Sequence, residues 1–205
     1  MGFYKDHVIP RLIELCMKNK ELAEHRAKVI PIAKGMVVEL GMGSGLNLPF
    51  YGASVKRLYG VEPSTKLLEM ARARADAVAF PVELVQQSAE QLPFDDESMD
   101  TVVVTWALCS IPEPQRALRE ARRVLRPGGQ LLFVEHGRSS DPGVERWQDR
   151  INPLWRAVAG GCNLNRKIDA LVREAGFDIT ELRTFYLSGP WPITYTYEGS
   201  AAFTR

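Results

Sequence analysis

The stretch "VVELGMGSGLNLPFY", residues 37–51, joins a short apolar run to a loop that contains three glycines. An apolar run that stops at alternating glycines is typical of a buried strand that turns sharply at its end. Glycine serves such a turn because it adopts positive φ and because it lets another molecule approach the main chain closely. Gly41, Gly43 and Gly45 alternate, which indicates both uses. The stretch therefore predicts a ligand held against the backbone after the first strand.

Strand and helix patterns alternate on both sides of this loop. Strands are predicted at 36–40, 55–61, 81–87, 100–108, 130–137, 178–187 and 193–203. Helices are predicted at 4–27, with an interruption or a start near Pro10, and at 46–51, 64–77, 113–129 and 166–177. The alternation predicts parallel βαβ units in an α/β, Rossmann-like, doubly wound sheet of seven strands, with helices on both faces. The short loop "SGPWP" (188–192) leaves no room for a crossover helix, so the final strand is predicted to be antiparallel.

A single domain accommodates all of these elements. We expect residues 1–34 to form a helical lid, 35–137 a cofactor-binding core, and 138–205 an acceptor-side segment with a C-terminal hairpin. The apolar stripe of the first helix runs beside Lys5, Arg11, Lys18 and Lys20, so peripheral contact with an anionic membrane surface is the alternative to a lid.

Composition excludes several classes of protein. The formal net charge of +1 shows no excess of basic residues of the kind that nucleic-acid-binding proteins carry, so no nucleic-acid partner is expected. The three cysteines, Cys16, Cys109 and Cys162, are widely spaced, which predicts neither a disulfide framework nor a metal site. Charges near the N-terminus and the absence of a long apolar run predict no secretory signal and no membrane span. A cytoplasmic protein is therefore expected.

Two acidic residues define the ligand of the glycine loop more closely. Glu39 stands just before the loop, where a carboxylate disfavours phosphate and suits a cationic group. Leu46 occupies the position of the third glycine in the dinucleotide fingerprint, which argues against a nicotinamide-dependent oxidoreductase. Glu62 ends the second predicted strand, where a carboxylate can accept hydrogen bonds from both hydroxyls of a ribose. A nucleoside with a positive charge in place of phosphate describes S-adenosylmethionine.

The glycine loop, the second-strand acid, "AEQLPF" (89–94) and "LRPGG" (125–129) follow one another in the order found in class I S-adenosylmethionine-dependent methyltransferases. Residues 35–137 resemble the type 11 branch, which includes quinone-biosynthesis C-methyltransferases. The segments "FYKDHVIPRL" (3–12) and "GGCNLNR" (160–166) are similar to a narrower subgroup of small-thiol and phospholipid methyltransferase-like proteins. The resemblance implies S-adenosylmethionine as methyl donor, S-adenosylhomocysteine as product, and no metal.

The resemblance also implies which residues bind the cofactor. These are Glu39, Gly41, Gly43, Gly45, Glu62, Pro63, Ser64, Ser88, Ala89, Thr105 and Leu108. Glu39 would line the methionine end, Glu62 would hold the ribose, and Thr105 would lie beside the sulfonium carbon. Ser88 stands where the family usually has an aspartate for the adenine amino group. Its hydroxyl either accepts that hydrogen bond in a weaker, neutral form or caps the turn that follows.

The catalytic residues are harder to predict from the sequence, because positioning and desolvation supply most of the rate of an in-line methyl transfer. A thiol or ammonium acceptor must lose a proton, and His136 is the candidate general base because it follows the fifth strand. A histidine without chemical role is the alternative. The candidate acceptor-binding residues are Cys109, Trp147, Asn163, Arg166 and Tyr195.

These observations predict an enzyme that transfers a methyl group from S-adenosylmethionine to a small, apolar acceptor such as a thiol or an amine lipid. Two alternatives remain open. One is a quinol-type C-methyltransferase, and the other is a cofactor-binding subunit that has lost catalysis and binds a partner protein. The sequence leaves the acceptor atom and the oligomeric state undecided.

Overall fold

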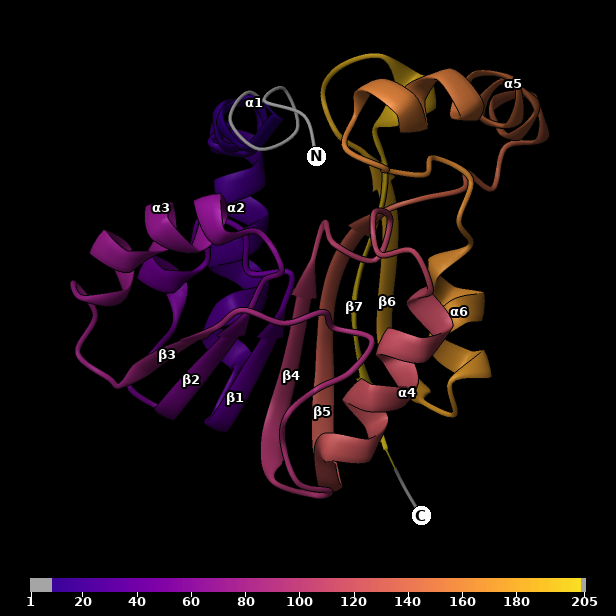
Figure 1. Cartoon of the computed structure of the whole chain (residues 1–205). Helices are drawn as coiled ribbons and strands as arrows, with labels where there is room; N and C mark the ends of the chain where they lie inside the picture. Colours follow the sequence, from indigo (N-terminus) through magenta and orange to yellow (C-terminus); the bar gives the residue numbers. More distant parts are fainter. Residues whose placement is uncertain (1–8, 204–205) are drawn as a thin grey trace.

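A computed structural model describes residues 9–203 of the protein, and its centre is one seven-stranded sheet with the order β3-β2-β1-β4-β5-β7-β6 (Figure 1). The strands are β1 (Gly35–Leu40), β2 (Val55–Val61), β3 (Val82–Val85), β4 (Met99–Thr105), β5 (Leu125–His136), β6 (Asp178–Tyr186) and β7 (Tyr195–Ala202). The first five strands pair in parallel, and β7 is antiparallel to both β5 and β6. The predicted doubly wound sheet with an antiparallel final strand is confirmed.

Helices cover both faces of the sheet. They are α1 (Ile9–Met17), α2 (Lys20–Val29), α3 (Thr65–Ala75), α4 (Pro114–Val124), α5 (Pro142–Val158) and α6 (Ile168–Glu174), with 3₁₀ turns η2 (Ile30–Ile32), η3 (Leu48–Phe50) and η4 (Trp191–Ile193). Alternate strand residues point to opposite faces. Val102 and Val104 therefore pack with α4 and α6, while Val103 packs with α2 and α3.

The carboxyl ends of the parallel strands point toward α1 and α5, which lie on opposite sides of this edge (Figure 1). In a doubly wound sheet, ligands bind outside this edge at the point where the strand order reverses. Here the reversal lies between β1 and β4. The predicted cofactor site therefore falls at this edge, beside the ends of β1 and β4.

The N-terminal helix prediction is corrected. The break among the described residues lies between Met17 and Lys20, because Asn19 caps α2 with its side chain, which accepts a hydrogen bond from the Glu21 N–H at 2.8 Å. The predicted start at residue 4, with Lys5, lies outside the described residues. Leu12 and Leu15 of α1 are exposed, so membrane contact through this helix stays a prediction. No helix within residues 9–203 is both long and apolar enough to cross a bilayer.

Two further helix predictions are corrected, and one helix was missed. The helix predicted at 46–51 is wrong: turns and η3 stand there, because the Asn47 side chain is held against Glu39 at the end of β1. The helix predicted to reach Gly129 ends at Val124, and a register shift in the β4–β5 pair accommodates Pro127 within the strand. Helix α5 was not predicted, although Asp141 followed by proline is a helix-start signal.

Candidate active site

The glycine loop lies at the carboxyl end of β1. Gly41, Gly43 and Gly45 have φ of 66°, 59° and 78°. A Cβ on Gly41 would come within 2.5 Å of the Ala107 Cβ, and one on Gly45 within 2.8 Å of Leu48. A Cβ on Gly43 would meet no atom of the described chain within 4 Å. Gly41 and Gly45 thus serve internal packing, whereas Gly43 presents bare main chain to open space, where a ligand can approach closely.

Glu62 faces this loop from the end of β2. Its Oε2 accepts a hydrogen bond from the Gly43 N–H at 3.1 Å, and its Oε1 accepts one from the Ser64 N–H at 3.0 Å. The residue is only 7% exposed, and this burial raises the pKa of its carboxyl above the ordinary value. Each carboxylate oxygen keeps a second lone pair, so both can also accept ribose hydroxyls. The structure brings Glu62, Gly43 and Ser64 together, and the ribose role stays a prediction.

Glu39 is enclosed by side chains of the protein itself. Asn47 Nδ2 donates to its Oε1 at 2.8 Å, and the Tyr51 hydroxyl donates to its Oε2 at 2.7 Å. Asn47 Nδ2 also donates to Thr105 Oγ1 at 2.9 Å, while Asn47 Oδ1 accepts from Arg26 Nε at 3.0 Å. Burial raises the pKa of Glu39 to about 7. A single amide thus joins the ends of β1 and β4 to helix α2.

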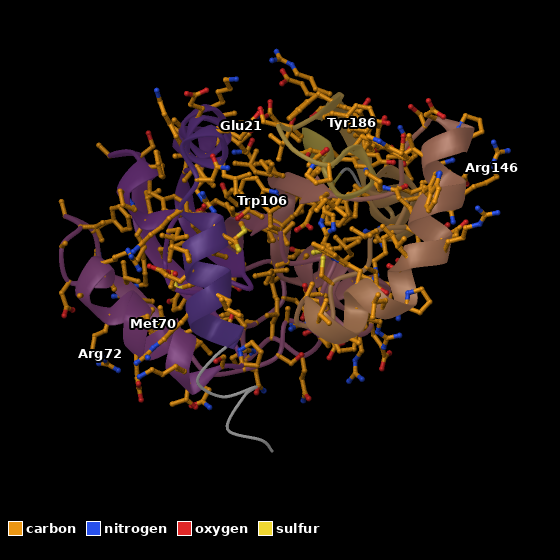
Figure 2. The ribbon with its side chains drawn as sticks, turned by 90° about the horizontal axis from the view of Figure 1, so that it is seen from above. Glu21, Met70, Arg72, Trp106, Arg146 and Tyr186 are labelled. Carbon is orange, nitrogen blue, oxygen red and sulfur yellow. The ribbon has the colours of Figure 1, made fainter. Side chains whose placement is uncertain are left out.

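The sequence analysis missed Asn47 and Tyr51, which donate to Glu39, and Arg26, which donates to Asn47. Arg26 belongs to the segment predicted as a lid, and its guanidinium also lies 4.7 Å over the ring of Trp106. Figure 2 looks onto the carboxyl edge and shows Trp106 near its middle. No local motif signals such a partner, since the contact depends on where α2 docks.

Helix α1 is bound directly to the glycine loop. The Ser44 hydroxyl donates a hydrogen bond to the Glu14 carboxylate, and Arg74 of α3 donates to the same carboxylate at 2.7 Å. Arg74 also donates to the Ser44 carbonyl at 2.6 Å. The first helix therefore contacts the predicted cofactor loop, as a lid would, and its movement on ligand binding stays a prediction.

The remaining cofactor candidates have structural roles in addition to any ligand contact. Ser88 caps a turn, since its Oγ accepts from the Glu90 N–H at 3.2 Å. Ala89 and Leu108 are buried in the core on the α4 face. Pro63 is exposed, and Ser64 caps α3 by accepting from the Leu67 N–H at 3.4 Å.

The loop after β4 closes around a second buried carboxylate, Glu135 of β5. Its oxygens accept hydrogen bonds from the backbone N–H groups of Ala107, Leu108 and Cys109 at 2.6, 2.9 and 3.3 Å. Burial raises the pKa of Glu135 to about 7. The sequence analysis missed this residue, although an acid inside the apolar run "LLFVEH" (131–136) was a usable signal. Glu135 fixes the turn that carries Cys109.

His136, the next residue, lies in a cluster with two cysteines from distant segments. Its Nε2 is 3.1 Å from the Sγ of Cys162. The Sγ atoms of Cys109 and Cys162 and a ring nitrogen of His136 all lie within 4.8 Å of one another. The wide spacing of these residues in the sequence gave no sign of the cluster, and the role of His136 as a base stays a prediction.

The other acceptor-side candidates do not converge on one point. Asn163 donates to the Cys109 carbonyl from its backbone N–H at 2.8 Å and from Nδ2 at 2.9 Å. Arg166 donates to the carbonyls of Leu108 and Ile111, so it supports the same loop. Tyr195 is buried, with its ring 5.0 Å from that of Tyr186 and 5.5 Å from that of Tyr197. Trp147 is half-exposed on α5, edge-on to Trp191 at 6.5 Å.

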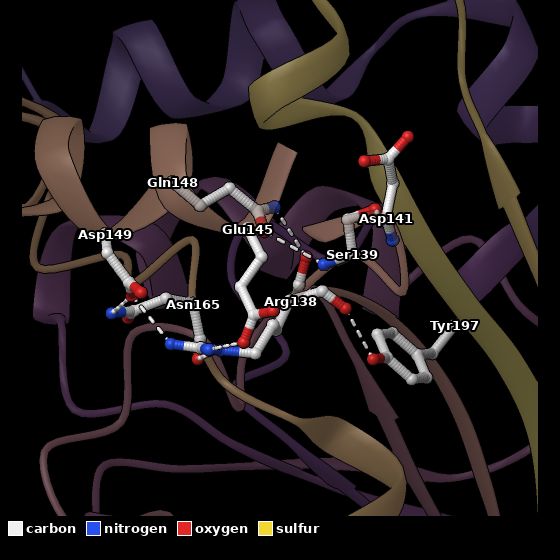
Figure 3. A network of polar contacts seen from close by, with 9 residues as sticks. Arg138, Ser139, Asp141, Glu145, Gln148, Asp149, Asn165 and Tyr197 are labelled. Carbon is white, nitrogen blue, oxygen red and sulfur yellow. Dashed lines mark hydrogen bonds and ion pairs between the residues drawn. The ribbon is translucent and has the colours of Figure 1, made fainter. Parts of the chain in front are cut away.

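Figure 3 shows the polar network that fixes the chain after β5. Arg138 donates to Asp149 Oδ1 at 2.6 Å and to the Glu145 carboxylate, both on α5. Gln148 Nε2 donates to the Gly137 carbonyl at 3.0 Å, and the Tyr197 hydroxyl donates to the Arg138 carbonyl at 2.5 Å. The network holds α5 against the end of β5, and thereby positions the loop that carries Cys162.

Taken together, these features define a doubly wound protein whose switch point carries an open glycine loop, at Gly43, beside a buried carboxylate at the end of β2. Comparison with known proteins narrows this class. A family model described as a methyltransferase domain matches residues 38–133. The chain belongs to the class I S-adenosylmethionine-dependent methyltransferases, in their type 11 branch.

Individual relatives differ in the acceptor that their names print. The chain is 34% identical over 152 residues to thiol S-methyltransferase TMT1B of Rattus norvegicus, covering 71% of this chain and 61% of that protein. It is 30% identical over 185 residues to thiol S-methyltransferase TMT1A of Homo sapiens, covering 88% and 75%. It is 40% identical over 104 residues to phosphatidylethanolamine N-methyltransferase of Cereibacter sphaeroides, covering 50% and 51%.

Solved structures share the fold. Phospholethanolamine N-methyltransferase 2 of Haemonchus contortus superposes with a TM-score of 0.69 at 15% identity, covering 96% of this chain and 57% of that one. At this identity the similarity concerns the fold alone.

Proposed function

We propose that the protein transfers the methyl group of S-adenosylmethionine to the sulfur of a small, apolar thiol and releases S-adenosylhomocysteine. Membership of the family supports the methyl donor. Similarity along 75% of a human thiol S-methyltransferase supports the acceptor, compared with about half of the phospholipid enzyme.

The cofactor would lie over the glycine loop. The ribose hydroxyls would bind Glu62, the main chain of Gly43 would border the methionine portion, and Thr105 would lie near the methyl group. Glu39 would not touch the cofactor but would position Asn47, which in turn holds Thr105. The acceptor sulfur would attack the methyl carbon in line, and the broken C–S bond would leave its electron pair on S-adenosylhomocysteine.

The observation that favours a thiol is that Glu135, Glu145 and Glu198, three acceptor-side carboxylates among the described residues 9–203, are already engaged by other groups of the protein. An amine acceptor approaches as an ammonium, and a carboxylate would hold it. Glu135 accepts three backbone N–H bonds, Glu145 is bound by Arg138, and Glu198 Oε2 lies 2.5 Å from His25 Nδ1. A thiol needs no such counter-charge, and the tyrosines of β6 and β7 suit an apolar body.

Release of S-adenosylhomocysteine across an acceptor panel tests the proposal. The panel contains an alkyl thiol, a thiophenol, a phosphatidylethanolamine dispersion and a reduced quinone precursor, each with saturating S-adenosylmethionine. We expect turnover on the thiols at least about tenfold above the other acceptors, and the Glu62→Ala protein supplies the background. Turnover confined to the phospholipid or the quinol would contradict the thiol assignment. Tight cofactor binding without turnover on any acceptor would favour a non-catalytic subunit.

A further inference from the structure

Two thiols and an imidazole meet at the carboxyl edge of the sheet, and we infer that they bind a zinc ion with one coordination position open for the acceptor. The three ligands are Cys109 after β4, His136 at the end of β5, and Cys162 after α5. The part concerning the acceptor rests on the proposed function, whereas metal binding by these residues does not.

The geometry of the cluster suits zinc. Zinc binds cysteine sulfur at about 2.3 Å and histidine nitrogen at about 2.0 Å in a tetrahedron, which sets neighbouring ligand atoms roughly 3.5 to 3.8 Å apart. The Cys162 Sγ to His136 Nε2 separation is 3.1 Å, and all three ligand atoms lie within 4.8 Å of one another. Small side-chain rotations therefore bring them onto one ion.

The number and chemistry of the ligands indicate the kind of site. Structural zinc sites close with four protein ligands, whereas catalytic sites keep three and leave one position for water or substrate. The cluster found among residues 9–203 supplies two cysteines and one histidine. Two thiolates also neutralise the double charge of zinc, so the ion adds no unpaired charge to a largely buried place.

Neighbouring groups hold the ligands in position, as is typical around protein-bound metals. The Asn163 backbone and side chain both bind the Cys109 carbonyl, which ties the loop of Cys162 to that of Cys109. Glu135 accepts the Cys109 N–H at 3.3 Å. The indole N–H of Trp155 is buried without an acceptor in the described part of the chain. A thiolate at Cys162 would give it one.

The open position would activate the acceptor. A thiol that coordinates zinc releases its proton to solvent and remains bound as a thiolate. Its sulfur then forms a bond to the methyl carbon, while the sulfonium C–S bond breaks and its electron pair stays on S-adenosylhomocysteine. The thioether product carries no charge, binds zinc weakly and leaves. Cys109 lies in the loop that directly follows Thr105 at the end of β4, so the metal would lie on the side of the edge where the methyl group is predicted.

Metal content tests the site without reference to activity. The reduced full-length protein is passed through gel filtration, and zinc per chain is measured by mass spectrometry. We expect one zinc per chain, and at least about a 100-fold weaker zinc affinity in Cys109→Ser and in Cys162→Ser. Cys16→Ser is the matched control, since Cys16 is exposed on α1, and it should keep the zinc. Calorimetric binding of S-adenosylmethionine to each variant reports that the fold is retained.

Cobalt substitution tests the open position. With S-adenosylhomocysteine bound, adding an alkyl thiol to the cobalt protein should shift the visible d–d bands and add sulfur-to-cobalt charge-transfer absorption. The site is overturned if the reduced protein binds neither zinc nor cobalt. The same conclusion holds if Cys109 and Cys162 are isolated as a disulfide and the protein still binds neither metal after that disulfide has been reduced. If that protein still methylates thiols, the proposed function stands while this inference fails. Metal binding without a spectral response to thiol, or full turnover after zinc removal, overturns the acceptor role.

Discussion

The two halves of the carboxyl edge are built in different ways. In the half predicted to bind the cofactor, the cofactor half, Glu39, Gly43 and Glu62 come from one strand–loop–strand segment, and their contacts follow from the ends of β1 and β2. In the half predicted to bind the acceptor, the acceptor half, Cys109, His136 and Cys162 come from three separate segments. A site made of neighbouring strand ends can be predicted from a short sequence motif. A site made of converging loops cannot, because its residues come together only when those loops pack.

The largest effect should come from removing the acid at the end of β2. Glu62→Ala should weaken S-adenosylmethionine binding by about 3 kcal/mol, because a charge-assisted, two-oxygen contact is lost and the Gly43 N–H loses its acceptor. This corresponds to about a 150-fold higher Kd in a calorimetric titration. Glu83→Ala, an exposed acid on β3, is the control. Unchanged affinity would remove the ribose assignment.

Glu39 and Glu135 allow the two halves to be compared as pH is changed. Burial raises the pKa of Glu39 to about 7, above its unfolded value of 4.5, so the folded state binds more protons. Stability should therefore fall as pH rises from 5 to 8, by about 2.5 kcal/mol from this group. Urea unfolding of the cofactor-free protein should show that Glu39→Gln lacks this loss.

Glutamine at position 39 can still pair with Asn47 and Tyr51, because both partners are side chains. Glu135→Gln should instead lose stability at both pH values, since an amide nitrogen would face a backbone N–H. If both glutamine variants change stability in the same way at the two pH values, the two halves do not differ in how they hold their buried carboxylates.

Two glycines of one loop should respond differently to alanine. Gly45→Ala should cost about 2 kcal/mol of stability, through positive φ and through contact with Leu48 and Ala71. Gly43→Ala bears the φ penalty of about 1 kcal/mol alone, but should weaken cofactor binding about tenfold, because its Cβ would enter the ligand space. Urea unfolding and calorimetry on both variants separate the effects. Normal cofactor affinity in Gly43→Ala would show that the ligand lies elsewhere.

The smallest effect should come from loosening α5. Arg138→Ala removes the contacts to Glu145 and Asp149 and should cost about 1 kcal/mol of stability, since these groups are partly exposed. The KM for the thiol should rise several-fold while the Kd of S-adenosylmethionine stays unchanged. Arg146→Ala, an exposed arginine on the same helix, is the control. Equal weakening of both ligands would mean that the two halves do not act separately.

The strands of the sheet could be predicted because a parallel strand covered on both faces is a continuous apolar run. The helices were harder to predict. The break at Asn19 and the start of α5 at Asp141 each depend on a single capping side chain. The hydrophobic periodicity used to predict helices contains no information on such caps. The segment after the glycine loop fails to become an α-helix because Asn47 is bound to Glu39, a contact that only the folded loop reveals.

The same limit applies to the site. Gly43 and Glu62 could be proposed as cofactor-binding residues because the reason for each residue type lies within the motif, and the structure brings the two together. Arg26 was missed because its role depends on how α2 docks. The cluster of two cysteines and a histidine was missed because separation along the chain says nothing of distance in space when three loops converge.

The amide of Asn47 has a consequence for which sequences this loop can accept. Arg26 holds its oxygen, while Glu39 and Thr105 both hold its nitrogen, so the group has one permitted orientation. Aspartate would set two carboxylates against each other, and leucine would remove one hydrogen-bond partner from each of three buried groups. Asparagine is thus the one residue of this size and shape that satisfies a base, an acid and a hydroxyl together. Asn47 takes no part in the chemistry, yet its residue type is as restricted as that of a residue that contacts a ligand.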